Sequence, residues 1–160
     1  ENLNRITDLN SGTLKTIRRL SMQISARNQI IGIIEKISLG AVNAEIQMKL
    51  KSGKSIVSII TNSSVENLGL AINDEVVAVI KSSNVLLSTQ TNLKLSARNS
   101  LNGNIEEINI GSVNAEVVVN IGNEDKIVAI VTINSIKNMN LKNETTVDVI
   151  IKASDIMIGK

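Results

Sequence analysis

Residues 25–28 have the sequence Ser-Ala-Arg-Asn, and the same four residues return at positions 96–99. A second stretch, Val-Asn-Ala-Glu at residues 42–45, returns at residues 113–116 with the same offset of about 71 positions. With this single shift and no gap, roughly 24 of the 63 positions from residue 25 to residue 87 match their partners. The sequence therefore predicts a tandem duplication, and the duplication decides the fold.

The duplication divides the 160 residues into four parts. In the leading part, Leu14, Ile17 and Leu20 recur at spacing three, which is typical of a short amphipathic helix. The chain begins with Glu1 rather than Met, which favours a fragment of something longer. We expect a linker helix segment at residues 1–23, a first unit at 24–87, a polar linker at 88–94 and a second unit at 95–160.

Within each unit the apolar residues follow the period of two that half-buried strands require. Gly32 lies inside the long first strand, where it predicts a bulge or a sharp bend. A short helix is expected after the third strand, with Asn62 or Ser63 as its N-cap and Gly69 at its left-handed exit. The expected strands of the first unit are 30–39, 44–50, 55–61, 75–81 and 85–87, with a hairpin turn at 51–54.

Five short strands and one helical turn are typical of a small OB-like barrel. The predicted fold is therefore mainly β, with two tandem OB-like five-stranded barrels that each carry a short helix and are preceded by a short linker helix. A unit of about 65 residues buries little apolar surface, so we expect the two units to pack together or the chain to dimerise.

The composition excludes several classes of function. The chain has no Cys, His, Pro, Trp, Tyr or Phe, which rules out disulfides, Cys or His nucleophiles, soft-metal sites and aromatic platforms for nucleic acid. The formal net charge is only +2, too small for a general polyanion-binding surface. The longest apolar runs fall short of a membrane span, so we expect a cytoplasmic protein without membrane contact. We also expect no enzyme activity and no catalytic residue, because the Lys and Glu side chains form no convergent constellation.

The polar residues that both units share are rich in hydrogen-bond donors. An Arg fork, a Lys point charge and Ser and Thr hydroxyls suit a small tetrahedral oxyanion, whose oxygens only accept hydrogen bonds. Simpler roles remain open for each of them. Arg27 can form a surface salt bridge beside an Asn in a turn, Thr61 and Ser64 can cap a helix, and Lys81 can lie in solvent. Glu45 and Glu116 are expected to pair with a nearby cation or to face solvent.

The ordered series of repeated residues resembles the molbindin (Mop, TOBE-type) molybdate-binding domain. The first unit carries the resemblance at Ser-Ala-Arg-Asn-Gln (25–29), Gly-Ala-Val-Asn-Ala-Glu (40–45), Ile-Thr-Asn-Ser-Ser-Val-Glu-Asn-Leu-Gly-Leu (60–70), Asp-Glu-Val (74–76) and Val-Ile-Lys-Ser-Ser-Asn-Val (79–85). The second unit matches at 96–99, 111–116 and 149–156 but departs after Thr132, where Ile133 and Asn134 replace Asn and Ser.

The resemblance implies a ligand, molybdate or tungstate, and a set of residues that bind it. No cofactor is implied, and no metal beyond molybdenum in its oxyanion. The implied ligand residues of the first unit are Ser25, Arg27, Thr61, Ser64, Lys81 and Ser82. Those of the second unit are Ser96, Arg98, Thr132, Ser135, Lys152 and Ala153, the last of which can offer only its backbone N–H.

Two roles are open for such a tandem pair. It occurs as the ligand-sensing half of ModE-type molybdate-responsive transcription regulators, and also as a stand-alone molybdate-storage protein. Residues 9–23 look like the linker helix of the regulators, so the sequence favours a homodimeric sensor whose DNA contact is made through a domain absent from this chain. A storage protein is the alternative, with a hexamer as its expected assembly. An OB-fold nucleic-acid binder is disfavoured because aromatic platforms and a basic groove are lacking.

Overall fold

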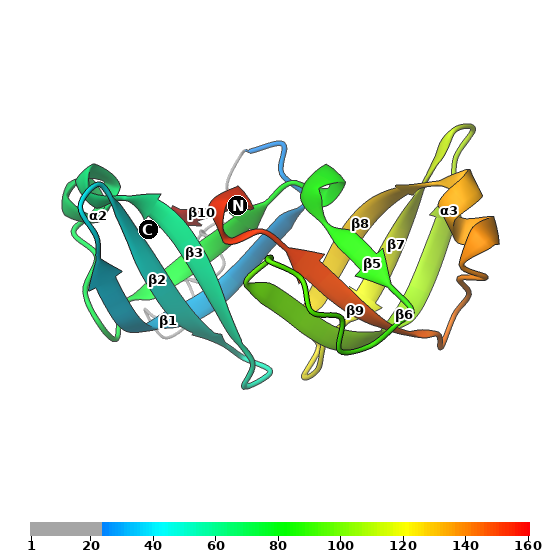
Figure 1. Cartoon of the computed structure of the whole chain (residues 1–160), viewed down its shortest axis with the longest axis horizontal. Coiled ribbons are helices and arrows are strands. Elements are labelled where there is room, and N and C mark those ends of the chain that lie inside the picture. The colour runs from blue at the N-terminus through cyan, green and yellow to red at the C-terminus, as the bar shows by residue number, and fades with distance from the viewer. Residues whose placement is uncertain (1–23) are drawn as a thin grey trace, which may run out of the picture.

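The computed structural model describes residues 24–160, which form two five-stranded sheets, each curled into a small barrel (Figure 1). This confirms the predicted mainly β fold, whereas the expected helix at 1–23 lies outside the described residues. The first repeat supplies β1 (Asn28–Leu39), β2 (Asn43–Leu50), β3 (Ser55–Thr61), α2 (Asn62–Leu68), β4 (Glu75–Ile80), the 3-10 turn η1 (Ser82–Asn84) and β5 (Leu86–Ser88). The second supplies β6 (Asn99–Ile110), β7 (Asn114–Asn120), β8 (Lys126–Thr132), α3 (Ile133–Asn138), β9 (Thr146–Ile151), η2 (Ala153–Asp155) and β10 (Ile156–Gly159).

The period-two pattern places one face of β2 and of β7 in the core, whereas β4 and β9 are buried on both faces. On β2, Ala44, Ile46, Met48 and Leu50 are buried, whereas the residues between them lie on the outer face. The same alternation holds on β7, where Ala115 is buried and Glu116 lies on the outer face. Outer-face side chains of β2 and β7 are therefore available for polar contacts.

The first strand bulges, but not at the glycine that the sequence indicates. The register between β1 and β2 shifts between Ile34 and Lys36, so the bulge lies at Glu35. Gly32 is regularly paired, and a Cβ there would lie 3.1 Å from Cγ of Met48. The expectation of a bulge at Gly32 is wrong. Glycine is suited to this position because the Met48 side chain packs so closely on it that a larger residue has little room, and not because the strand bends there.

The turn and helix signals are largely confirmed. Gly53 has φ +87° in the hairpin turn between β2 and β3, and Gly69 ends α2 with φ 58° and ψ 46°. The N-cap of α2, however, is Thr61 and neither Asn62 nor Ser63. The hydroxyl of Thr61 accepts the hydrogen bond of the Ser64 amide, so the helix begins one residue earlier than expected.

The closing strands are exchanged between the two barrels. β5, from the first repeat, pairs with β9, whereas β10, at the end of the chain, pairs with β4. The sheet orders are β10-β4-β1-β2-β3 and β5-β9-β6-β7-β8. The sequence indicates a closing strand within each unit, and the structure differs because η1 and η2 carry the chain across to the other barrel, where they pack on β8 and β3. Ser88, assigned to the linker by composition, is the last residue of β5.

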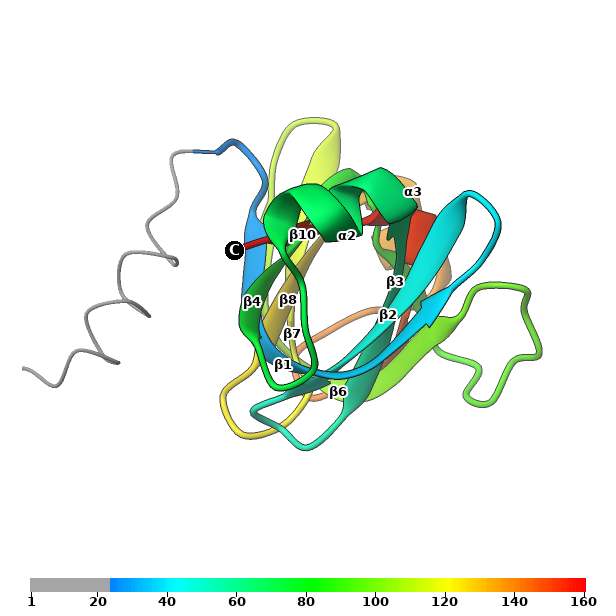
Figure 2. The ribbon, with the colours of Figure 1, turned by 90° about the vertical axis from the view of Figure 1, so that its left-hand side faces the viewer.

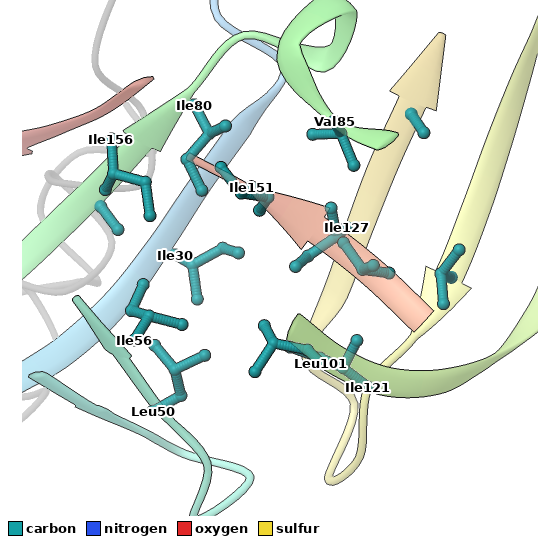
Figure 3. Close-up of a cluster of buried hydrophobic side chains, with 14 of the residues drawn as sticks. Ile30, Leu50, Ile56, Ile80, Val85, Leu101, Ile121, Ile127, Ile151 and Ile156 are labelled. Carbon is teal, nitrogen blue, oxygen red and sulfur yellow. The ribbon is translucent and has the colours of Figure 1, made fainter. Parts of the chain in front are cut away.

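The two barrels share a large apolar core, and a second small cluster contains Ala26, Val77 and Val79. Figure 2, seen from the end of the first barrel, shows the second barrel behind the first, with α2 at the near end. Between the barrels lies a single apolar cluster in which Ile56, Ile80 and Ile156 of the first barrel meet Val85 and Ile151 of the second (Figure 3). Because each barrel holds a strand of the other repeat, neither sheet is complete without both repeats.

Candidate oxyanion-binding site

Each Ser-Ala-Arg-Asn stretch is anchored to the opposite barrel by its asparagine. The Asn28 amide donates to the Val128 carbonyl at 2.9 Å and accepts from the Val128 N–H at 2.7 Å. Asn99 makes the same two bonds to Val57, at 2.8 and 2.7 Å. β8 and β3 are the last strands of their sheets, so the two amides pair with strand edges that lack a neighbour there. Both Asn side chains are buried strand residues, which corrects the expectation of an Asn in a turn.

The arginines beside these anchors bind carboxylates across the junction. Arg27 donates through both of its terminal nitrogens to both oxygens of Glu116 on β7. Arg98 binds Glu45 on β2 in the same way, at 2.7 and 3.3 Å. The surface salt bridge expected as the simpler role of Arg27 is therefore present, and so are the cation partners expected for Glu45 and Glu116.

The electrostatics follow from these pairs. The hydrogen bond and charge of Glu116 raise the pKa of Arg27 above its ordinary value. The hydrogen bond from Arg98 lowers the pKa of the Glu45 carboxyl, and the positive charges of Arg98 and Lys36 act in the same direction. Both pairs are about half exposed, with side-chain exposures of 50% for Arg27 and 49% for Arg98. Water and salt therefore reach both arginines.

The lysines lie next to the arginines. Asn28 is opposite Ile80 in the antiparallel pair of β1 and β4, so Arg27 and Lys81 extend from the same end of two neighbouring strands. Arg98 and Lys152 are related in the same way through Asn99 and Ile151. Both lysines are exposed, and neither makes an ion pair with any residue in the part of the chain that the structure describes. Two lysines without an ion-pair partner among residues 24–160 therefore lie beside two carboxylate-bound arginines.

The next residues differ between the repeats. Ser82 begins η1 and is buried, and Ala153 takes the same place at η2. Both turns pack against the edge strand of the opposite barrel. Ser25 and Ser96, two residues before each arginine, are exposed.

The hydroxyl pairs lie at the starts of the two helices. Thr61 Oγ1 is 2.8 Å from Ser64 Oγ, and Thr132 Oγ1 is 3.0 Å from Ser135 Oγ. Each threonine also caps its helix, as the simpler role predicts. One hydroxyl proton of each pair is used within the pair, which leaves the other to donate to a bound acceptor.

The structure groups the predicted residues by barrel contact and not by repeat. Arg27 and Lys81 flank the paired ends of β1 and β4, where Arg27 and the turn η1 contact the second barrel, whereas Thr61 caps α2 and Ser64 lies in its first turn. Figure 1 shows α2 at the outer end of the first barrel. The carboxylate that binds Arg27 belongs to Glu116, which is opposite Ile130 on β8. Thr132 follows Ile130 by two residues on the same face of β8, so the two residues are about 7 Å apart along the strand. Within one chain, Arg27 thus binds a carboxylate that lies near the hydroxyl pair of the second repeat.

Sequence reasoning expected a cation partner for the two repeated glutamates but did not identify it as the arginine of the opposite barrel, and it missed the anchoring role of the two asparagines. Their repetition with the arginine was the available signal, but it gave no direction in space. The described residues contain no group of three or more acidic side chains that could hold a metal ion. They also contain no helix long and apolar enough to cross a membrane.

Two strand-exchanged barrels that present repeated cations and hydroxyl donors define a tandem small-barrel protein with the donor chemistry of an anion-binding module. The TOBE domain profile matches residues 24–87 and 95–158. The chain belongs to the TOBE domain family.

The relatives of the chain include proteins named for molybdenum transport and for molybdenum-pterin binding. The chain is 36% identical over 159 residues to the molybdenum transport protein ModE of Azotobacter vinelandii, covering 97% of this chain and 59% of that protein. It is 34% identical over 147 residues to the molybdenum-pterin-binding protein MopA of Rhodobacter capsulatus, covering 91% of this chain and 56% of that protein. The chain thus spans a little more than half the length of these relatives.

A solved structure shares the whole tandem arrangement. The cytoplasmic molybdate-binding protein ModG, in a crystal form with molybdate bound, superposes with a TM-score of 0.83 at 39% identity. The match covers 86% of this chain and 99% of ModG. The two-barrel architecture is therefore that of a known molybdate-binding protein.

Proposed function

We propose that the chain binds molybdate or tungstate, without catalysis, as the ligand-sensing part of a molybdenum-responsive transcription regulator. The observation that carries this proposal is the duplicated donor set, which occurs on the same architecture as molybdate-bound ModG. The relatives named for molybdenum transport and molybdenum-pterin binding support the same ligand class.

The chemistry of the donors fits a tetrahedral dianion. The Arg and Lys side chains supply positive charge, and the Ser and Thr hydroxyls supply neutral donors that the oxygens of molybdate accept. We assign the ligand contacts to the twelve residues that the family resemblance implies, with the backbone N–H of Ala153 in place of a hydroxyl. Sulfate is smaller, so it leaves some donors unmatched, at a cost of about 1 to 3 kcal/mol for each buried donor.

Sensing requires that occupancy changes the assembly. A dianion that binds between two copies stabilises the dimer arrangement that presents the cations to it, so ligand occupancy can reach an attached DNA-binding domain. DNA contact belongs to such a domain, outside this chain. A homodimer also buries more apolar surface than two small barrels bury alone.

Titration calorimetry of the purified chain with molybdate, tungstate, sulfate and phosphate tests the ligand. Molybdate and tungstate should bind with similar affinity, and sulfate and phosphate far more weakly. Equal affinities for sulfate and molybdate would contradict the proposal.

The second candidate is a stand-alone cytoplasmic molybdate-storage protein. The match to ModG favours it, because the tandem barrels alone account for 99% of that chain. Light scattering separates the two candidates, since we expect a dimer for the sensor and a hexamer for the storage protein. A folded monomer in the presence of molybdate would count against both.

A further inference from the structure

Both arginines of the proposed sites already hold an anion. Glu116 occupies the two terminal nitrogens of Arg27, and Glu45 occupies those of Arg98. The two pairs are equivalent in the two repeats, and each joins one barrel to the other. Ion pairs this exposed contribute little to stability, so a role in stability alone gives a weak account of the duplication.

A carboxylate and a tetrahedral oxyanion compete for the same donors. The guanidinium fork offers two parallel N–H groups along its outer edge, and either a carboxylate or two oxygens of an oxyanion can accept them. The two anions repel each other, so they cannot both occupy this edge. Each guanidinium has three further N–H groups that the carboxylate does not use, and the side of the guanidinium next to the lysine stays open to a ligand.

We propose that Glu45 and Glu116 are specificity-determining residues that act as internal competing ligands. Each holds the arginine of the opposite barrel until an oxyanion of higher charge displaces it. This inference rests on the proposed function, because it takes Arg27 and Arg98 as ligand-binding residues.

Two consequences follow for ligand choice and for coupling. A monoanion replaces a carboxylate of equal charge at the arginine and gains only the attraction of the adjacent lysine, whereas a dianion is attracted more strongly to both cations. Binding of the oxyanion also breaks an Arg–Glu ion pair between the two barrels, so ligand binding directly changes the contacts at their junction. The Asn28 and Asn99 anchors and the exchanged strands remain in place.

The test compares the full chain with its E45Q, E116Q and E45Q/E116Q variants in calorimetric titrations with molybdate at fixed ionic strength. Glutamine keeps the shape of the side chain but removes the competing charge. We expect roughly threefold to tenfold tighter binding when both carboxylates are replaced. E106Q is the matched control, because Glu106 binds Lys126 and is as exposed as Glu116, at 33%. Its affinity for molybdate should equal that of the unmodified chain.

A second measurement separates competition from a merely structural role. Nitrate, a monoanion, should weaken molybdate binding in E45Q/E116Q and have little effect on the unmodified chain. Circular dichroism confirms that the variants are folded, and the single variants serve if the double variant is not. Equal or weaker molybdate affinity in the variants, or equal nitrate competition in both proteins, overturns this inference alone. Failure of the unmodified chain to bind molybdate overturns the proposed function and this inference with it.

Discussion

At the scale of the residue, the two anchoring asparagines replace a missing strand. Asn28 and Asn99 are only 2% and 3% exposed, and each amide satisfies one N–H and one carbonyl of an edge strand. An amide is suited to this place because it carries a donor and an acceptor side by side, as a backbone peptide does. The anchors therefore fix the position of the neighbouring arginines.

Replacement of such an anchor should destabilise the protein. Asn99→Ala removes two hydrogen bonds and leaves the Val57 N–H and carbonyl without these partners, which should cost about 1 to 3 kcal/mol of unfolding free energy. Urea denaturation measures the change. Asn67→Ala, at an exposed position on α2, is the control and should change stability by less than about 0.5 kcal/mol. Equal effects at the two positions would show that the anchor is not needed.

A substitution at Lys81 should change ligand affinity without breaking an ion pair, because no carboxylate among the described residues pairs with it. Lys81→Ala should weaken molybdate binding by roughly tenfold or more, since an adjacent cation is lost from a dianion site. Lys49→Ala is the matched control, because Lys49 is also an exposed lysine at the surface of the first barrel but lies outside the proposed set. If calorimetry gives the same loss for both, diffuse electrostatics accounts for the effect and the site assignment is wrong.

At the scale of the element, the sequence predicts strands and turns well and partners poorly. Alternation along β2 and the glycine exit of α2 are local signals, and both are confirmed. The sequence misplaced the bulge of β1, which lies at Glu35, and the N-cap of α2, which is Thr61, by one to three residues each. Both positions depend on tertiary context, such as the packing against Met48, which a local pattern does not contain.

The exchanged strands and the arginine partners could not be predicted at all. The apolar pattern of residues 85–87 is the same whichever barrel receives the strand, so periodicity carries no information on the exchange. The repeat suggests that Arg27, Thr61 and Lys81 act together, but Arg27 binds Glu116 of the opposite barrel, and the turn η1 that follows Lys81 packs on β8 of that barrel. Duplicated sequences are ambiguous in this way, because either copy of an element can fill the same place.

Outer-face carboxylates make the strands sensitive to acid. Hydrogen bonds lower the pKa of three glutamates below the ordinary value of 4.5. The donors are Gln47 and Ser55 for Glu35, and Arg98 for Glu45. For Glu106 they are Asn120 and Lys126. The unfolded chain lacks these bonds and takes up protons at higher pH, so their stabilisation is present above about pH 4.5 and is lost as the pH falls through the lower folded pKa values.

The urea midpoint should therefore decrease between about pH 5 and pH 3. A variant in which glutamine replaces all three carboxylates should show a shallower decrease over the same range. Identical slopes for the two proteins would assign the acid sensitivity to other groups.

At the scale of the whole molecule, the exchange ties the barrels together without the connecting segment. The part before residue 90 supplies β5 to the second barrel, and the part after it supplies β10 to the first. A protease site introduced at residues 90–91 and then cleaved should leave two fragments that stay associated, because separation would strip a strand from each sheet. Size-exclusion chromatography of the nicked protein should give the mass of the intact assembly, and separate elution of the fragments without denaturant would contradict the exchange.

The position of β10 also determines when the first barrel can finish folding during translation. Its last residue in the sheet is Gly159, so the first barrel, although it begins at residue 28, lacks its outermost strand until residue 159 has left the ribosome. At about 5 to 20 residues per second, the nascent first barrel waits on the order of 4 to 16 s between the emergence of β4 and that of β10. Domains usually finish folding in the order of their translation. Here the first barrel cannot be completed before the second, and the open edge of β4 is a place where nascent chains on one message could take up each other's terminal strands.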